Sequence, residues 1–245
     1  MNPTIEILKS HRSIRKFTNK KIDESLLKEI VLAGQAAASS SFLQGVSIIR
    51  ITDKVKRNKF SELANNQQYI NTASEFLVFC ADMNRSSQCC EWHGEKATEG
   101  FTEQFIISTV DTALFAQNLV IAAESEGLGI CYIGAIRNNP TLATELLELP
   151  KNVYPVFGLC LGYPDQNPET KPRLPVSIVM KENSYSNNGD KTKIAAYDEI
   201  IREYYKNRTG NNKSVSWSEQ MSGLLGKEVR VYMRDFLRGR GFEMK

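Results

Sequence analysis

The 245-residue sequence contains only two histidines, His11 and His93, and its cysteines form no CxxC pair. A site built on several histidines or on paired cysteines is therefore unexpected, and no metal site is predicted. The sequence also lacks the patterns GxGxxG, GxxxxGK[ST] and GxSxG. These absences argue against a dinucleotide-binding strand-turn-helix, a P-loop and a serine hydrolase. No pair of carboxylates stands out for acid–base catalysis.

Long apolar segments are missing as well. No unbroken run approaches the ~18 apolar residues that span a bilayer, and the first 20 residues have no apolar stretch typical of a signal peptide. The cysteines are five, an odd number, in a chain this long. A reduced, cytoplasmic protein without membrane contact is the natural expectation. Adjacent Cys89 and Cys90 are either incidental or reactive thiols.

The chain also has little excess of charge of either sign. There are 31 Lys and Arg against 28 Asp and Glu, which gives +3 and argues against a nucleic-acid-binding protein. The charge is uneven, because residues 206–245 carry nine Lys and Arg against four Asp and Glu. This basic C-terminal extension is either a solvated helix surface or a surface for a charged partner.

Hydrophobic periodicity alternates between buried strands and helices, which predicts a layered domain of mixed helix and sheet. The segment 83–97 is polar and is expected to be an irregular surface excursion. The helix near 98–126 is apolar nearly all round, so it must be covered by the core or by a partner. The predicted strands are 46–51, 75–82, 130–134 and 153–163, and the predicted helices are 4–10, 24–34, 54–64, 98–126, 140–148, 197–208 and 216–238.

Polar segments interrupt this apolar framework at separated places. The stretch HRSIRKF, residues 11–17, combines cationic side chains with apolar ones, so it is not a simple solvated charge run. Others are the serines at 39–41, NNQQ at 65–68, the turn YIGA at 132–135, and KPR at 171–173. None places a nucleophile beside a base. The set favours binding of an anion and a polar ring, as in enzymes whose cofactor performs the chemistry.

Seven ordered blocks, HRSIRKFT, SSSFLQ, SIIRITD, VFCAD, YIGAIRNN, FGLCLGYP and KPRLP, resemble the oxygen-insensitive nitroreductases of the larger, group A type. These are NADPH-dependent FMN enzymes that include the NADPH flavin reductases. The resemblance covers nearly the whole chain. It implies an α+β fold with a central β-sheet flanked by helices, in an intertwined homodimer with a buried interface helix. It also implies one FMN-binding domain over 1–245, including the basic extension 206–245, with FMN lying between subunits.

The resemblance assigns the flavin site residue by residue, and the residue types suit the chemistry. Guanidinium groups grip phosphate in a bidentate way, which makes Arg12 and Arg173 the candidates for the FMN phosphate. Arg15 or Lys171 is the candidate cation near N1 and O2, and a backbone N–H at Gly134 is the candidate donor to N5. The full predicted set is His11, Arg12, Ser13, Ile14, Arg15, Ser39, Gln67, Tyr132, Ile133, Gly134, Ala135, Lys171, Pro172 and Arg173.

The turn YIGA departs from the YIGG common in this family. Ala135 therefore adds a methyl group beside the flavin, and a left-handed backbone there would be costly. Arg208, with Lys213 as a second candidate, falls where the family places a cation for the 2′-phosphate of NADPH.

The predicted activity is ping-pong, two-electron reduction of nitro compounds, quinones or flavins by NADPH. Chemistry takes place at N5 of FMN, and no side chain acts as a catalytic acid or base. The rival interpretation is a non-catalytic flavin-binding redox sensor.

Overall fold

The computed structural model describes residues 2–245, which form two compact units. Unit 1 comprises the chain up to Asn167 together with Arg230–Lys245, and unit 2 is Pro168–Val229. The basic extension is thus divided, since 206–229 belong to unit 2 and 230–245 to unit 1. Whether the chain acts as the single flavin-binding domain expected from the sequence stays a prediction.

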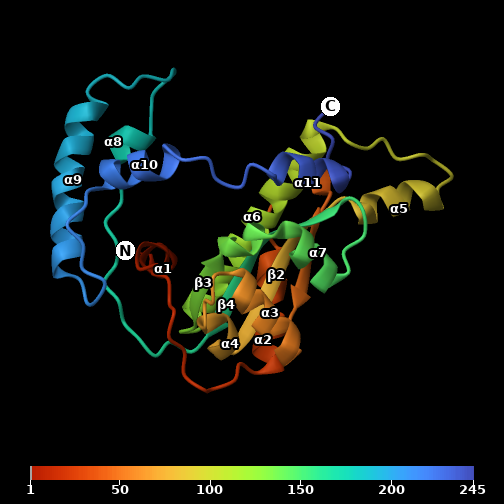
Figure 1. Cartoon of the computed structure of the whole chain (residues 1–245), viewed down its shortest axis with the longest axis horizontal. Coiled ribbons are helices and arrows are strands. Elements are labelled where there is room, and N and C mark those ends of the chain that lie inside the picture. The colour runs from red at the N-terminus through yellow and green to blue at the C-terminus, as the bar shows by residue number, and fades with distance from the viewer. Residues whose placement is uncertain (1) are drawn as a thin grey trace. The chain divides into compact units, whose positions relative to one another are not determined.

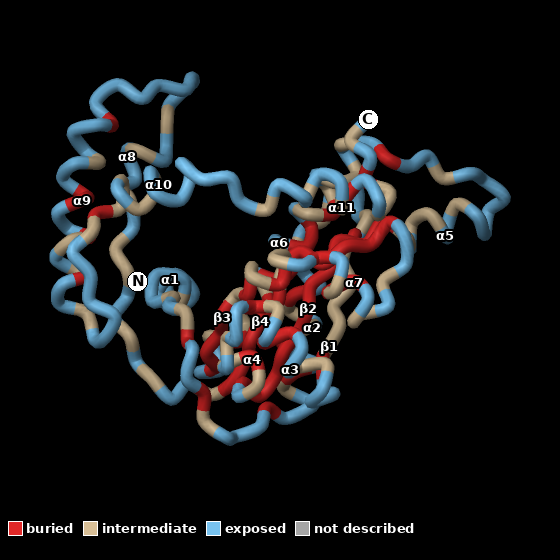
Figure 2. The backbone as a smooth tube through the Cα atoms, in the orientation of Figure 1, coloured by how far each residue is buried: buried red, intermediate tan, exposed pale blue. Residues whose placement is uncertain are grey.

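The centre of unit 1 is a four-stranded antiparallel sheet in the order β1-β2-β4-β3 (Figure 1). Its strands are β1 (Val46–Arg50), β2 (Glu75–Asp82), β3 (Gly129–Ile133) and β4 (Val153–Gly162). All four lie where the apolar runs predicted them. Every residue of β2 is buried, because helices cover both faces of the sheet, as the burial colouring in Figure 2 shows.

Alternate strand residues face the two helical layers. Phe76 and Val78 of β2 point into one core with α3 (Lys54–Leu63), α4 (Tyr69–Thr72) and α7 (Pro140–Leu147). Leu77 and Phe79 point into the other, with α2 (Glu24–Gln35) and α6 (Thr102–Ser125). Side chains of adjacent strand residues point to opposite faces, so a strand with apolar residues throughout requires both layers. The remaining unit 1 elements are α1 (Pro3–Lys9), η1 (Ser40–Phe42), α5 (Asn84–Trp92), η2 (Gly134–Asn138) and α11 (Met233–Gly239).

Helix α6 is long and apolar enough, by length and composition, to cross a membrane, although no unbroken apolar run revealed this. It is nevertheless a core helix. Eight of its residues are buried, among them the charged Asp111, whose carboxylate accepts hydrogen bonds from the loop before β1. A charged side chain with these partners is satisfied by the protein itself. The helix therefore belongs to the core of unit 1.

Two helix predictions are wrong, and the helix predicted at 197–208 begins earlier than expected, at Asp190. The segment 83–97 contains the helix α5, which buries none of its residues and so carries no apolar periodicity to detect. The single helix predicted at 216–238 is two helices, α10 (Trp217–Leu225) and α11. Helix α10 ends at Gly226, and Arg230 has a left-handed backbone with φ of 54°, which no continuous helix can contain.

Unit 2 is built from α8 (Val176–Val179), α9 (Asp190–Asn207) and α10 (Figure 1). Its core consists of Tyr197, Ile201 and Tyr205 of α9, which recur every four residues and so share one face of the helix. Helix α10 begins with a capping box between Ser216 and Glu219, as its sequence favours.

Candidate functional site

The cationic segment 11–15 lies along the outer edge of β3. The backbone N–H of Ile14 donates to the carbonyl of Ile130 at 2.8 Å, and Ser13 forms a parallel bridge with the same residue. Ile14 is buried against Gly129, where a Cβ atom would lie only 2.6 Å from Ile14 Cγ1. Glycine at 129 thus allows the segment to approach the sheet this closely.

The polar side chains of this segment have different surroundings. His11 Nδ1 lies 2.6 Å from Glu124 Oε1 at the end of α6. Arg12 is exposed and lines a cavity of about 580 Å³ together with Ser10 and Ile14. No side chain within 2–245 pairs with the Arg12 guanidinium. Arg12 is therefore a free cation at the mouth of a cavity, whereas His11 is already engaged.

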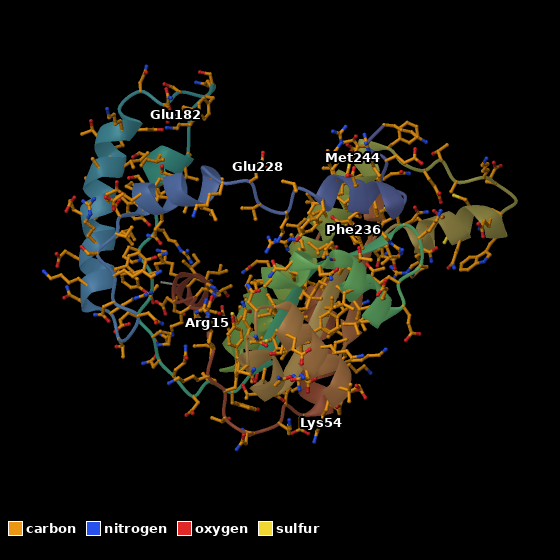
Figure 3. The ribbon with its side chains drawn as sticks, viewed as in Figure 1. Arg15, Lys54, Glu182, Glu228, Phe236 and Met244 are labelled. Carbon is orange, nitrogen blue, oxygen red and sulfur yellow. The ribbon has the colours of Figure 1, made fainter. Side chains whose placement is uncertain are left out.

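Arg15, labelled in Figure 3, lies close to Tyr69 and Cys131. Burial raises the pKa of the Tyr69 hydroxyl, and the positive charge of Arg15 offsets part of this rise. Burial likewise raises the pKa of the Cys131 thiol, so this cysteine stays protonated at neutral pH and is not a nucleophile. Polar chemistry beside Arg15 is thus limited to binding.

Gln67 follows a tight turn in which Asn65 and Asn66 both have left-handed backbones. The turn is joined to η2 through Asn65 Oδ1, which accepts from Asn138 Nδ2 at 3.4 Å. Two residues after Gln67 comes Tyr69, beside Arg15. The side-chain amide of Gln67 makes no hydrogen bond within the described chain, so its donors and acceptor are available to a ligand.

The predicted turn after β3 is a short 3₁₀ helix. Tyr132 packs edge-on against Phe157 with 5.0 Å between ring centroids, and burial with the nearby Glu124 charge raises its pKa to about 12. Ile133 is in the core, so only its backbone can face a ligand. Ala135 lies in η2 and is not among the residues with positive φ. Ala135 therefore does not have the costly left-handed backbone considered from the sequence.

Ser39 lies apart from the other predicted flavin residues of unit 1. Its hydroxyl donates to Asp111 at 2.6 Å, whereas His11 is held at Glu124 of the same helix. Thirteen residues of α-helix separate these two acids, or about 20 Å at 1.5 Å per residue. The loop after Ser39 has left-handed backbones at Ser41, Phe42 and Gln44, and Phe42 is 80% exposed. Unit 1 brings 11–15, 67 and 132–135 together but not Ser39.

Unit 2 contains the remaining predicted residues. Lys171 Nζ donates to the Tyr205 hydroxyl at 2.7 Å, and the Pro172 carbonyl accepts from the Tyr197 hydroxyl at 2.8 Å. Arg173 is exposed. Arg208 lies over the ring of Tyr205, with its guanidinium carbon 4.6 Å from the ring centroid. Lys171 and Arg208 thus meet at one tyrosine, and the backbone N–H of Lys213 donates to that tyrosine's carbonyl at 3.2 Å.

Comparison with known proteins identifies the family of the chain. The family model "Nitroreductase family" matches residues 8–163, and "Nitroreductase family, C-terminal domain" matches residues 171–245. The chain belongs to the nitroreductase family. This confirms the resemblance seen in the ordered sequence blocks, and with it the nitroreductase-like α+β fold.

Relatives within the nitroreductase family cover the chain from end to end. The oxygen-insensitive NADPH nitroreductase of Salmonella typhimurium is 46% identical, with 99% of each chain covered. The FMN reductase (NADPH) of Bacillus subtilis is 43% identical, also over 99% of each chain. The structure of NADPH:FMN oxidoreductase from Vibrio harveyi complexed with NAD⁺ is 43% identical and superposes with a TM-score of 0.91 over 100% of both chains.

Sequence reasoning missed three residues that organise the candidate site in this nitroreductase-family chain. They are Tyr69 beside Arg15, Asp111 beneath Ser39, and Tyr205 between Lys171 and Arg208. Asp111 did leave a signal, because it is a single acid within an otherwise apolar stretch of helix. The two tyrosines left none, since a tyrosine in an amphipathic helix is usually a core residue.

Proposed function

We propose that this protein is an NADPH-dependent FMN oxidoreductase that reduces flavins or nitro compounds by two electrons. The observation that carries the proposal is the free Arg12 guanidinium beside a cavity on the edge of β3. Relatives that match over the whole chain are an NADPH nitroreductase and an NADPH-dependent FMN reductase.

The residues of unit 1 fit FMN. A flavin phosphate needs a cation without an internal partner, and Arg12 is one. Ser13 is the next residue in the same segment. The polar edge of the flavin ring needs hydrogen-bonding groups, and the amide of Gln67 is unpaired. Arg15 adds positive charge on the same side of unit 1 as Tyr69. When bound, FMN would supply two-electron transfer between NADPH and the acceptor.

The chain's own residues bind and orient in this proposal, and none acts as an acid or base. Arg12 and Ser13 would hold the phosphate, and His11 keeps the start of the segment at Glu124. Arg15 and Gln67 would hold the ring edge, where a nearby cation favours added negative charge. The turn at Gly134 and Ala135 would offer backbone donors. Solvent can supply the protons.

Lys171, Pro172 and Arg173 remain proposed flavin residues on the strength of the sequence blocks. Arg208, followed by Lys213, is proposed to read the 2′-phosphate of NADPH. Arg208 is the first residue of an exposed loop rich in glycine and asparagine. Its contact with Tyr205 nevertheless holds the Arg208 side chain in one place.

We propose further that the active form is a homodimer. Ile106, Val110 and Leu114 recur every four residues on α6 and are each nearly half exposed, which leaves an apolar stripe uncovered. Ser39 lies too far along α6 to share one flavin with 11–15 of the same chain. A second copy placed against α6 would cover the stripe, and could bring its own Ser39 and exposed Phe42 to the site.

Many planar oxidants, quinones included, are proposed as acceptors. A cytoplasmic location is proposed as well, and the five free cysteines favour it. The test is a visible spectrum of the purified protein, followed by NADPH addition under argon and then by a nitro compound. Bleaching of the flavin and its recovery over repeated turnovers support the reductase. A yellow protein that NADPH leaves unbleached would instead support the redox sensor.

A further inference from the structure

Tyr205 contacts two residues for which sequence resemblance gave separate roles. It is 4% exposed, on the buried face of α9. Its hydroxyl accepts from Lys171 Nζ at 2.7 Å, and its ring carries the Arg208 guanidinium at 4.6 Å from the centroid. One side chain therefore bonds a proposed flavin cation through its oxygen, with that ammonium also 5.0 Å from the ring centroid, and supports a proposed NADPH cation on its ring.

The direction of the Tyr205 hydroxyl is set by a chain of hydrogen bonds within unit 2. Gln220 Nε2 donates to the carbonyl of Ser216 at 2.9 Å, which turns Gln220 Oε1 toward Tyr205. The Tyr205 hydroxyl donates its single proton to that oxygen at 3.0 Å. Its lone pairs are then left for Lys171. An ammonium group has three N–H donors, so two remain for a ligand.

The ring acts on Arg208 in a different way. Arg208 follows directly after α9, and its Nε donates to the carbonyl of Asn211 at 3.2 Å. Stacking on Tyr205 confines an otherwise flexible guanidinium before any ligand arrives, so less side-chain freedom is lost on binding. Burial acts to raise the pKa of Tyr205, but the hydrogen bonds with Lys171 and Gln220, together with the positive charges of Lys171 and Arg208, outweigh it, so the net pKa is lowered.

We propose that Tyr205 is a positioning residue that orients Lys171 through its hydroxyl and Arg208 through its ring. The proposal rests on the roles proposed above for those two cations. It adds that FMN affinity and nicotinamide preference depend on two separable parts of one side chain. A tyrosine that serves only the core of unit 2 would instead change thermal stability and move neither property selectively.

Two substitutions separate the two parts. Tyr205→Phe keeps the ring and removes the hydroxyl, whereas Tyr205→Leu removes both. Tyr205→Phe should weaken FMN binding about three- to tenfold, which is less than the direct loss of a hydrogen bond to a charged group because Lys171 itself remains, and should leave the NADPH/NADH ratio of kcat/KM within twofold. Tyr205→Leu should weaken FMN at least as much, because the Lys171 ammonium also lies 5.0 Å from the ring centroid, and should in addition lower that ratio about two- to fivefold. The FMN measurement is fluorescence of flavin released from the diluted holoenzyme.

Tyr204→Phe is the matched control, because Tyr204 neighbours Tyr205 and its hydroxyl makes only a long contact, 3.4 Å, to the Glu169 carbonyl. It should change neither property. Gln220→Met tests the hydroxyl without disturbing the ring, and remains informative should Tyr205→Leu not fold. It frees the hydroxyl proton, so FMN binding should weaken about two- to fivefold with an unchanged NADPH/NADH ratio.

The proposal is overturned if Tyr205→Phe shifts the nicotinamide ratio as much as Tyr205→Leu, or if neither variant moves FMN affinity. The variants Lys171→Ala and Arg208→Ala then show whether the positioning role of Tyr205 or the roles of the two cations is wrong. If these variants change FMN affinity and the NADPH/NADH ratio respectively while the Tyr205 variants do not, the positioning role alone fails. If they too have no effect, the roles proposed for the two cations fail and the inference falls with them.

Discussion

Replacing Arg12 with alanine should release FMN without unfolding the protein. Arg12 is exposed and makes no hydrogen bond or ion pair within the described chain, so its removal breaks no internal contact. The free energy of unfolding of the flavin-free protein should stay within about 0.5 kcal/mol of the parent. A hydrogen bond to a charged group is worth about 1.5–3 kcal/mol, and solvent exposure favours the lower end. FMN affinity should then fall about tenfold.

The assay dilutes the holoenzyme and follows the fluorescence of released FMN. Arg12→Lys keeps the charge but not the bidentate geometry, so its affinity should lie between those of the parent and the alanine variant. Adding Arg173→Ala should bring the loss to at least about a hundredfold if the two cations act independently. Lys16→Ala is the control, because Lys16 is an exposed cation directly after the segment 11–15. An Arg12→Ala protein that keeps FMN within twofold of the parent would refute the assignment.

Three further substitutions test the scaffold. Gly129→Ala should cost about 1–3 kcal/mol of stability and weaken FMN binding, because its Cβ would lie 2.6 Å from Ile14; denaturant titration measures the first effect. Asp111→Ala leaves the loop donors of residues 39–45 unpaired, so it should lower stability by about 1–3 kcal/mol and reduce bound flavin. Burial acts to raise the pKa of Asp198, but hydrogen bonds from Ser218 outweigh it and the net pKa is lowered. The ionised carboxylate therefore stabilises the fold above its usual pKa, and this stabilisation is lost as the pH falls and the carboxylate is protonated. Asp198→Asn should therefore lower the melting temperature at pH 7 and flatten its fall below about pH 4.

Each of these tests has its own control. Gly223→Ala, in α10, adds a methyl group with nothing within 4 Å and should leave stability unchanged or slightly higher. A Gly129→Ala protein as stable as the parent would show that the segment 11–15 moves away without cost. For Asp198→Asn the control is Asp53→Asn, which removes a carboxylate at the exposed start of α3, where Asp53 is the N-cap. An acid profile for Asp198→Asn that parallels the parent's would exclude Asp198 as the titrating group.

The strands were predictable because β2 and β4 lie between two helical layers and are apolar except for Glu75 and Asp82 at the two ends of β2. The same reasoning could not find α5, whose exposed residues follow no pattern. It joined α10 to α11 because the apolar stripe resumes in register after the break at Gly226. Local periodicity reports which face is buried, and it is silent where nothing is buried or where a turn happens to preserve the period.

The site was predictable as a set of segments rather than as an arrangement. The blocks around Arg12 and Gln67 gave the residues that we propose to face a ligand. They could not show that Ser39 is bound to Asp111 about 20 Å along α6 from His11, because that separation depends on which turn of the helix each loop contacts. Nor could they show that Lys171 and Arg208 share Tyr205.

The pairing of Ile14 with Ile130 has a consequence for the solubility of the protein. Strand β3 lies at the end of the sheet order, and an uncovered edge strand offers unpaired N–H and C=O groups to other chains. The segment that would hold the flavin phosphate is the one that covers this edge. Because residues 14 and 130 are far apart in sequence, the cover forms only after a large chain closure. Molecules in which it detaches would expose β3 to edge-to-edge aggregation, so resistance to aggregation depends on the same few residues that are proposed to retain the cofactor.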